Sequence, residues 1–365
     1  MTTRVLHVFG IMNRGGAELR TLALMPSMQA LGYEFHFCVL SGAEGALDDD
    51  IRAMGGQIHY LKLGPAFIWR FVRLLKHQHI SILHTHVALV SGLLVLLGAI
   101  AGVKKRISHL RSTLDTRSSS ILRIWRNALL RRCLYRFSHH VLGVCQGALQ
   151  CQWPDYAQRP KCQVIYNGMA LPPIEEKADF WSAWIEGYAG QPVVVHLARM
   201  NPAKNHTAVI AIFNAYLSAH EDAFLVLIGK EDPLIKTQLN QFIAEKGIAD
   251  RVIFLSEQAQ PLAFLRHAQA LLFPSLWEGL PGAVLESASV GTPVLASAIP
   301  GCQEIAKQLK AVETAELKQS PHEWAEHLAM LLKKGNGRAS LIEDFKHSDF
   351  LLDKNIRALN AVYAN

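Results

Sequence analysis

The chain has 365 residues, half of them hydrophobic, which is enough to bury two separate cores. Its 37 Lys and Arg against 30 Asp and Glu suit an anionic ligand or membrane surface, but they do not indicate a nucleic-acid-binding protein without a basic-aromatic module. Because the six cysteines form neither a CxxC pair nor a zinc-type cluster, we expect reduced thiols in a cytoplasmic protein. The N-terminal residues MTTRVLHVFG lead straight into an expected strand and do not have the pattern of a signal peptide.

The first half of the chain alternates strand-like and helix-like segments. Strands are expected at residues 4–10, 34–41, 58–63 and 80–86, and helices at 17–32, 48–56 and 67–78. Such alternation is typical of a parallel sheet with helices on both faces. Residues 87–103 form an uncharged run of 17, at the short limit for a membrane span. Because this run is rich in Gly, Ala and Val and directly follows a strand, we favour a packed core helix.

A second series of the same kind follows a Pro-punctuated stretch at residues 156–173. Strands are expected at residues 193–199, 224–229, 251–256, 270–275 and 294–297, with helices between most of them. We therefore expect an α/β protein with two doubly wound domains, at residues 1–172 and 173–344, and a hinge near Pro172. In such sheets ligands bind beyond the carboxyl ends of the strands, so the residues there are the candidates for function.

Two glutamates, Glu278 and Glu286, flank a Gly-Leu-Pro-Gly turn in the segment SLWEGLPGAVLES. Pro281 suits the first turn of a helix, because its missing N–H would be unpaired there anyway. Glu278 is therefore expected in a loop and Glu286 about one turn into a helix. Free N–H groups at a helix start attract anions. The pattern indicates a ligand with both phosphates and hydroxyls, and two solvated glutamates at a strand–helix connection remain the alternative.

Two basic residues follow the first strand of the second half. Arg199 ends the segment VVVHLAR, and Lys204 comes five residues later, before a helix expected to start at Asn205. Two such cations can hold a diphosphate between them. We favour this interpretation over a solvated basic loop, because the turn after Glu278 should lie across the same strand ends.

A pair of glycines, Gly15 and Gly16, follows the first strand and opens a helix. The pair permits a tight turn whose N–H groups can face a phosphate. The pattern is not GxGxxG, which disfavours a nicotinamide dinucleotide, and a plain strand–helix connection remains equally open.

Histidines end two strands of the first half. His84 and His86 close the fourth expected strand, and His109 with Arg111 closes the next. Alternate residues of a strand share a face, which is also the arrangement of a metal site. No carboxylate or cysteine accompanies the histidines, so contact with a sugar hydroxyl is favoured over metal.

Residues 104–136 carry ten Lys and Arg against one acidic residue, Asp115. A basic helix that also contains Trp, Tyr and Leu can lie on anionic lipid. The arginines do not share one helical face, however. A partly packed helix whose arginines reach the solvent remains the alternative.

Taken together, these segments resemble the group 1 (family 4) retaining glycosyltransferases. The resemblance rests on GGAE after the first strand, HTH at the fourth, VIYNG at the junction, R-x4-K, and PSLWEGLPGAVLESASVGTPVLAS, and it spans the chain in order. It implies two Rossmann-like domains facing across a cleft (the GT-B fold), with residues 345–365 crossing back to the first domain. The implied reaction moves a sugar from a nucleotide-sugar to a lipid-linked or polysaccharide acceptor of the cell envelope, reached from the cytoplasmic face of the membrane.

The resemblance also implies roles on the donor side. Glu278 lies at the donor sugar, and Glu286 binds the ribose hydroxyls. Arg199 and Lys204 stabilise the departing diphosphate without a bound metal or cofactor, and the sugar is retained in configuration without a protein nucleophile. Backbone contacts to the sugar and phosphates come from the loop that consists of Gly279, Leu280, Pro281 and Gly282.

On the other side of the implied site, Gly15 and Gly16 match the turn that closes on the phosphates. His86 matches a position near the transferred sugar. The residues implied on the acceptor side are His84, His109 and Arg111.

The sequence departs from the family pattern at three places. Glu231 stands where relatives commonly carry a second glycine, and Ser256 with Glu257 replaces a usual glycine near the expected base, so the nucleotide is undecided. The C-terminal segment is short. Two other functions remain alternatives, namely a nucleotide-sugar epimerase on the same fold and a catalytically inactive glycan-binding or membrane-binding partner.

Overall fold

A computed structural model describes residues 2–113, 120–171, 178–220, 222–333 and 337–364. The chain divides into two units, which we call the N-terminal unit (residues 1–168 and 352–365) and the C-terminal unit (residues 169–351). We expected the division at residue 172 and the return of the chain at residue 345, whereas the division follows Gly168 and the return begins at Leu352. The hinge candidate Pro172 lies outside the described residues.

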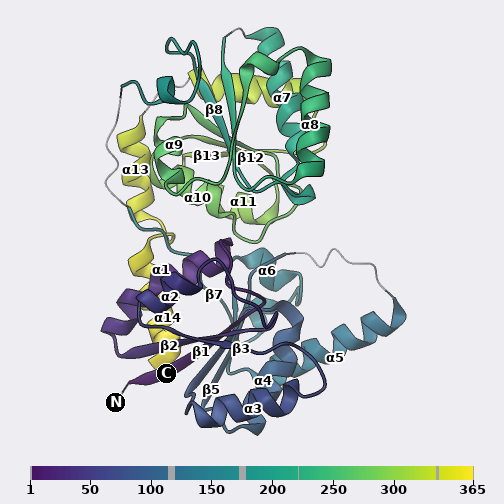
Figure 1. The fold of residues 1–365 in the computed structure, drawn as a ribbon, viewed down its shortest axis with the longest axis vertical. Coiled ribbons are helices and arrows are strands. Elements are labelled where there is room, and N and C mark those ends of the chain that lie inside the picture. Colours follow the sequence, from purple (N-terminus) through teal and green to yellow (C-terminus); the bar gives the residue numbers. More distant parts are fainter. Residues whose placement is uncertain (1, 114–119, 172–177, 221, 334–336, 365) are drawn as a thin grey trace. The chain divides into compact units, whose positions relative to one another are not determined.

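The N-terminal unit is built on a parallel sheet with the strand order β3-β2-β1-β4-β5-β6-β7 (Figure 1). Its strands are β1 (Thr3–Phe9), β2 (Tyr33–Val39), β3 (Gln57–Tyr60), β4 (Ile82–Thr85), β5 (Lys105–Leu110), β6 (His140–Gly143) and β7 (Cys162–Val164). Its helices are α1 (Gly16–Ala30), α2 (Asp48–Ala53), α3 (Phe67–His77), α4 (Ser91–Ile100), α5 (Ile121–Phe137), α6 (Gln146–Gln150) and α14 (Leu352–Ala364), with short 3₁₀ turns at Ala88–Val90 and Tyr156–Gln158.

Helices cover both faces of this sheet, as the near-continuous apolar strands predict. Side chains of α1 and α14 pack with Val5, Phe35 and Phe37 on one face. On the other face, α3 and α4 pack with Leu6 and Val8 of β1. The doubly wound arrangement expected for the first half is therefore confirmed.

The C-terminal helix α14 belongs to the N-terminal unit, as the resemblance implied. Its residues Leu359, Val362 and Tyr363 are buried in the core that α1 and the sheet form. Tyr33 of β2 donates a hydrogen bond to Asn360 across a distance of 2.9 Å, so polar as well as apolar contacts hold the helix in place.

The apolar run at residues 87–103 forms the packed helix that we favoured. Its α-helical part, α4, spans only Ser91–Ile100, and Gly92 lets it approach α5 so closely that a Cβ there would lie 2.1 Å from the carbonyl oxygen of Leu130. Among the residues that the structure describes, none of the helices has the length and apolar character needed to cross a bilayer.

The C-terminal unit contains a second parallel sheet, with the strand order β10-β9-β8-β11-β12-β13. Its strands are β8 (Val193–Leu197), β9 (Phe224–Ile228), β10 (Val252–Leu255), β11 (Ala270–Phe273), β12 (Val294–Ser297) and β13 (Val312–Ala315). Its helices are α7 (His206–Ala219), α8 (Pro233–Lys246), α9 (Pro261–His267), α10 (Gly282–Ser289), α11 (Pro300–Ala306), α12 (Pro321–Lys333) and α13 (Arg338–His347), with 3₁₀ turns at Trp181–Ala183, Pro202–Lys204 and Ala249–Arg251.

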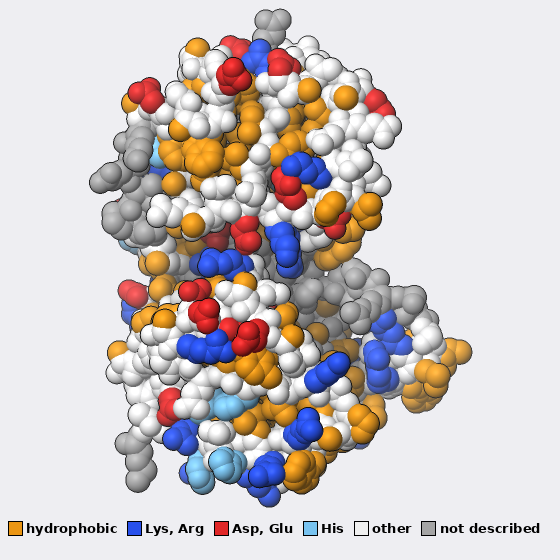
Figure 2. All heavy atoms as spheres, viewed as in Figure 1, with side chains coloured by type: hydrophobic (Ala, Val, Ile, Leu, Met, Phe, Trp, Pro, Cys, Tyr) orange, Lys and Arg blue, Asp and Glu red, His pale blue; other side chains and the backbone are white. Residues whose placement is uncertain are grey.

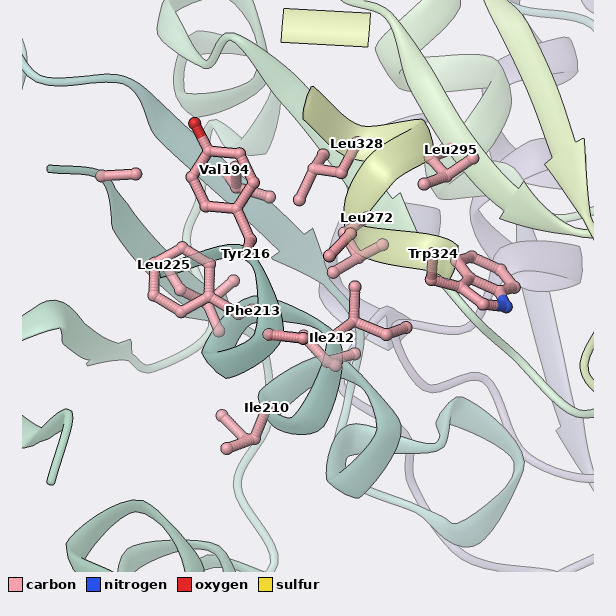
Figure 3. Close-up of a cluster of buried hydrophobic side chains, with 14 of the residues drawn as sticks. Val194, Ile210, Ile212, Phe213, Tyr216, Leu225, Leu272, Leu295, Trp324 and Leu328 are labelled. Atoms are coloured by element: carbon pink, nitrogen blue, oxygen red, sulfur yellow. The ribbon is translucent and has the colours of Figure 1, made fainter. Parts of the chain in front are cut away.

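A single apolar cluster joins this sheet to α7 and α12. Ile212 and Phe213 of α7 pack with Leu272 of β11, and Trp324 and Leu328 of α12 close the cluster (Figure 3). The burial of these side chains holds the carboxyl ends of β8 and β11 side by side, and the loops that follow these strands carry the donor-side candidates.

The six cysteines, all of them among the described residues, are free thiols.

Candidate active site

The donor-side candidates of the C-terminal unit lie in two loops that follow adjacent strands. β8 pairs with β11, Arg199 and Lys204 follow β8, and Glu278 lies in the loop after β11. Because parallel strands end at the same edge, both loops lie at the carboxyl edge of the sheet. The expectation that the Glu278 turn lies across the same strand ends as the two cations is therefore confirmed.

Hydrogen bonds join these two loops. The amide of Leu276 donates to the carbonyl of Ala203 at 2.8 Å, and the side-chain amide of Asn205 donates to the carbonyl of Pro274 at 3.0 Å. Asn205 has a φ of +55°, a left-handed conformation that asparagine tolerates better than most residues. The result is a fixed backbone frame for the charged side chains.

The side chains of Lys204 and Glu278 form an ion pair within this frame. Their side chains are 18% and 17% exposed, and the ammonium group of Lys204 also lies 5.1 Å from the centre of the Phe273 ring. A largely desolvated pair of this kind holds each group in one position. The lysine and the first glutamate, 74 residues apart in the sequence, therefore belong to one site.

Glu286 lies in the second turn of α10, close to the position expected. The helix begins at Gly282 after Pro281, whose extended conformation (φ −70°, ψ 117°) places it just before the first turn. Glu286 is half-buried on the same helix whose N-terminus adjoins the Gly279–Gly282 loop. The helix thus carries the N–H groups of its first turn and the carboxylate of Glu286 on one element.

The N-terminal turn of α11 also packs against the Gly279–Gly282 loop. Gly301, in the first turn of α11, approaches the loop so closely that a Cβ there would lie 1.8 Å from the carbonyl oxygen of Gly279. Glycine is therefore required at position 301, because any larger residue would overlap the backbone of the loop. Sequence analysis did not single out Gly301, and its position after the strand VLAS was the available signal.

The departures from the family pattern lie at neighbouring strand ends of the same sheet. Glu231, after β9, is paired with Lys236 of α8 at 2.7 Å. Ser256 and Glu257 are exposed after β10.

In the N-terminal unit, the histidine candidates lie on or just after two adjacent strands. His84 belongs to β4 and His109 to β5, while His86 follows the end of β4. His84 is opposite His7 of β1 in the strand register, and the four imidazoles face the side covered by α1 and α14. The exposed fractions of His7, His84, His86 and His109 are 1%, 1%, 8% and 4%.

These histidines form two hydrogen-bonded chains. In the first, Nε of Arg111 donates to Nδ1 of His86 at 3.2 Å, and Nε2 of His86 lies 3.0 Å from Nδ1 of His7. In the second, the hydroxyl of Tyr363 lies 2.7 Å from Nδ1 of His84, whose Nε2 lies 3.2 Å from Nδ1 of His109. Four of the predicted residues are therefore brought together.

Burial keeps this cluster neutral apart from Arg111. Burial, with the charge of Arg111, lowers the pKa of His7 to about 3. Burial likewise lowers the pKa of His84, His86 and His109 well below 6.5. The pKa of Arg111 is also lowered by burial, to about 10, so the guanidinium stays charged at neutral pH.

The two glycines at the start of α1 have φ angles that other residues can adopt. Gly15 is the N-cap residue, with φ −106° and ψ 160°. A Cβ at Gly16 would meet nothing within 4 Å, and one at Gly15 would meet only the Glu18 side chain, with its nearest atom at 2.3 Å. Neither its backbone conformation nor packing against the described residues requires glycine at position 16. The space beside Gly16 is therefore open to a ligand.

Sequence analysis missed three members of the N-terminal cluster. His7 was passed over inside an apolar strand, although a lone histidine between Leu6 and Val8 was a usable signal. Asn167 of the VIYNG segment accepts from Nη1 of Arg111 at 2.6 Å. Tyr363 lies 279 residues after His84, and the sequence contains no local sign of this contact.

One ring nitrogen from each of His7, His84 and His86 lies within 4.8 Å of the other two. Among the described residues, this is the one group of side chains with the spacing of a metal site. The donor set does not fit a metal. A metal on Nε2 of His86 needs a proton on Nδ1 of that ring, yet Nδ1 faces Nε–H of Arg111, which can only donate.

Two family models match the chain, one in each unit. A model for Glycosyltransferase Family 4 matches residues 14–171, and a model for Glycosyl transferases group 1 matches residues 181–347. Together they cover most of the chain. The chain belongs to the group 1, family 4 glycosyltransferases. This glycosyltransferase is therefore an enzyme that uses a nucleotide-sugar, as the resemblance implied, and the paired Lys204 and Glu278 lie inside the second match.

Named relatives agree with this family. The glycosyltransferase is 29% identical over 334 residues, 91% of each chain, to the capsular polysaccharide biosynthesis glycosyltransferase CapH of Staphylococcus aureus. It is 24% identical over 272 residues, covering 70% of this chain and 68% of the relative, to the UDP-Gal:alpha-D-GlcNAc-diphosphoundecaprenol alpha-1,3-galactosyltransferase of Escherichia coli.

Solved structures share the fold. HepE of Anabaena in complex with UDP superimposes with a TM-score of 0.82 over the full length of both chains, at 16% identity. The two-domain GT-B fold expected from the sequence is confirmed.

Proposed function

We propose that this glycosyltransferase moves a sugar from a UDP-sugar to a lipid-linked or polysaccharide acceptor in cell-envelope glycan synthesis, with retention of configuration and without a metal. The observation that carries the proposal is the joining of the Arg199–Lys204 loop to the Glu278 loop at the carboxyl edge of the second sheet. The products of this synthesis are capsule, exopolysaccharide or lipopolysaccharide.

The charges of the C-terminal unit suit the departure of a nucleoside diphosphate. Breaking the bond between sugar and phosphate builds negative charge on the leaving group, which Arg199 and Lys204 stabilise in the proposed reaction. Lys204 is held by Glu278 before the donor arrives, so the ammonium group is already in position. Glu278 then lies at the donor sugar, the Gly279–Gly282 loop contacts sugar and phosphates, and Glu286 binds the ribose hydroxyls.

The N-terminal candidates act on the sugar and the acceptor in this proposal. His86 lies near the transferred sugar, and His84, His109 and Arg111 form the acceptor side, while Gly15 and Gly16 approach the phosphates. Both ring nitrogens of His86 are hydrogen-bonded, to Arg111 and His7. An imidazole held in this way is a poor general base, which favours a retaining reaction in which the departing phosphate takes the acceptor proton.

Metal independence is supported by the same contacts. The cations that would replace a metal are Arg199 and Lys204, and the histidine cluster opposes metal binding because Arg111 can only donate to it. No cofactor besides the nucleotide-sugar is proposed.

The relatives' names support the class of donor and acceptor. The Escherichia coli relative is named for a UDP-Gal donor and a diphosphoundecaprenol-linked acceptor, and HepE is seen with UDP-glucose. CapH is named for capsular polysaccharide. We propose the same classes for this enzyme, with UDP as the first nucleotide to test.

An exposed basic and apolar surface on the N-terminal unit supports a membrane-bound acceptor. On α5, Leu122 and Trp125 are 83% and 73% exposed beside several arginines, and on α3 Trp69 is 63% exposed. Figure 2 shows orange and blue side chains together on α5. Residues 61–154 contain 14 Lys and Arg and one acidic residue, Asp115, which itself lies outside the described residues. Such a surface suits anionic lipid at the inner face of the cytoplasmic membrane.

The donor site is tested by thermal unfolding with UDP, GDP, CDP and ADP. We expect UDP to raise Tm, because a ligand at 100 times its Kd stabilises a protein by about 2.7 kcal/mol. Glu286→Ala and Lys204→Ala should lose this shift. Glu313→Ala, which replaces a half-buried glutamate on the edge strand β13, should keep it. A shift that survives in both site variants would contradict the proposed donor site.

Membrane contact is tested by sedimentation with phosphatidylglycerol and phosphatidylcholine vesicles. The wild type is expected to bind the anionic vesicles and to dissociate as salt is raised, since about 1 kcal/mol per basic residue is at stake near the surface. Leu122→Glu/Trp125→Glu should abolish binding. The matched control is Leu234→Glu on α8, where the side chain is 77% exposed in the C-terminal unit. Equal binding by the control and the double variant would remove the proposed role of α5.

A further inference from the structure

The protons in the histidine cluster of the N-terminal unit can be placed by following each chain from its first donor. Arginine has N–H donors and no acceptor. Since Nε of Arg111 faces Nδ1 of His86, that nitrogen must accept, and the proton of neutral His86 is on Nε2. This proton points to Nδ1 of His7, so His7 carries its own proton on Nε2.

The second chain starts from Tyr363. Burial raises the pKa of this phenol well above 10, so the hydroxyl keeps its proton. If the hydroxyl donates to Nδ1 of His84, the proton of His84 is on Nε2 and points to Nδ1 of His109. The proton of His109 is then on its Nε2. Among the described residues, His84 is the one hydrogen-bond partner of the Tyr363 hydroxyl, so the hydroxyl proton has an acceptor only if it is donated to His84.

Both chains therefore end in an N–H group that has no partner in the described part of the protein. Nε2 of His7 and Nε2 of His109 are buried, and neither has a hydrogen-bond partner among the described residues. Both side chains line one cavity beneath α1 and α14, together with Arg111 and Asn167. Asn167 accepts from Arg111 through its oxygen, so its amide N–H groups are donors as well.

The cavity suits a small oxygen group. Its free volume is about 10 Å³, close to the space that one water-sized group needs. Thr21 and Asn355 also line the cavity, but the two imidazole N–H groups of His7 and His109 are donors, so an atom that bonds to both must accept hydrogen bonds. A hydroxyl oxygen of a carbohydrate has this size and chemistry.

We propose that Arg111 and Tyr363 are positioning residues that set the protons of the four histidines, so that His7 and His109 present N–H donors to one hydroxyl oxygen of the carbohydrate ligand. The ligand class rests on the proposed function, whereas the proton positions do not. The C-terminal helix thereby contributes to the site through the hydroxyl of Tyr363, in addition to Asn355 and Leu359, which line the cavity.

The proton positions can be read by nitrogen NMR of the full chain labelled with ¹⁵N-histidine, with signals assigned by single His→Gln variants. In the wild type we expect His7, His84, His86 and His109 each to be neutral and protonated on Nε2. A wild type with the proton of His84 or His86 on Nδ1 would overturn the proposal. This readout needs no substrate, so it can fail or succeed independently of the proposed transfer activity.

Two substitutions should each disturb one chain only. Tyr363→Phe removes the first donor of its chain and should mix the proton positions of His84 and His109 while leaving His7 and His86 unchanged. Arg111→Met should mix the proton positions of His86 and His7 while leaving His84 and His109 unchanged. Arg111→Lys keeps a donor and should retain the wild-type pattern, so it provides the test if the methionine variant folds poorly. Disturbance of all four histidines by either substitution would indicate a merely structural role and overturn the proposal.

A matched control is available on the same helix interface. Tyr33→Phe removes the hydroxyl that holds Asn360 of α14, but Tyr33 belongs to neither chain. It should leave all four histidines unchanged. With a working acceptor, Tyr363→Phe should raise KM for the acceptor about tenfold with little change in kcat, as loss of one aligned hydrogen bond does, and Tyr33→Phe should not.

Zinc provides the opposing test. If the cluster were a metal site, Zn²⁺ added to the wild type would raise Tm and shift the signals of His7, His84 and His86 at one equivalent. We expect neither effect in the wild type, because Arg111 occupies Nδ1 of His86. Stoichiometric binding at these three residues would overturn the proposed donor-only site.

Discussion

Replacing Lys204 with alanine is expected to lower kcat/KM by about 10²–10³-fold, the usual effect of removing one group that stabilises charge in a transition state. Lys204 supplies a positive charge from a position set by Glu278 and by the hydrogen bonds of the adjoining loops. The charge on the departing diphosphate appears during the reaction, so most of the loss should be in kcat. Steady-state kinetics with a UDP-sugar and a lipid-linked acceptor measure this effect.

The control for Lys204→Ala is a second lysine–glutamate pair in the same unit. Lys236 pairs with Glu231 at 2.7 Å, and Lys236→Ala should change kcat/KM by less than about twofold, as expected for a partly exposed pair. Lys204→Arg, which keeps the charge, should recover part of the activity. Equal losses in Lys204→Ala and Lys236→Ala would show that breaking any such pair is enough and would contradict the assigned role.

Replacing Gly301 with alanine is expected to weaken UDP binding by at least about tenfold and to destabilise the protein by about 1–3 kcal/mol, as overpacking does. The added Cβ would lie 1.8 Å from the carbonyl oxygen of Gly279, so either α11 or the Gly279–Gly282 loop must move. In the proposed donor site, movement of the loop takes its backbone groups away from the phosphates. Isothermal titration with UDP and urea unfolding measure the two effects separately.

The matched control for Gly301→Ala is Gly337→Ala in the same unit. A Cβ at Gly337 would meet nothing within 4 Å, so both UDP affinity and stability should stay close to those of the wild type. If Gly301→Ala loses stability but binds UDP normally, the helix has moved instead of the loop, and the loop's part in donor binding is not supported by this contact.

The alternation of strands and helices was predicted from the sequence through most of the chain, because strands buried on both faces read as short apolar runs between amphipathic segments. Residues 138–155 and 298–347 are the exceptions. No element was predicted there, although β6 and α6 lie in the first range and α11, β13, α12 and α13 lie in the second. In β13 only two of the four residues are buried, so its apolar signal is weak.

The candidate site was predictable where its residues are close in sequence. The Glu278–Glu286 block and the Arg199–Lys204 pair were recognised because each fits into one strand–loop–helix connection. His7 was missed because one histidine in an apolar strand looks like any other core position until its neighbours across the sheet are known.

The sequence by itself determined the fold class, the family, and the two loops that carry the charged residues, since these depend on local pattern and spacing. The tertiary structure alone decided which side chains meet. Lys204 pairs with Glu278, and Tyr363 of the last helix reaches His84 on β4, because strand register and helix docking place residues from distant parts of the chain together. Proton positions follow from these contacts, since a donor such as Arg111 dictates which nitrogen of its partner must accept.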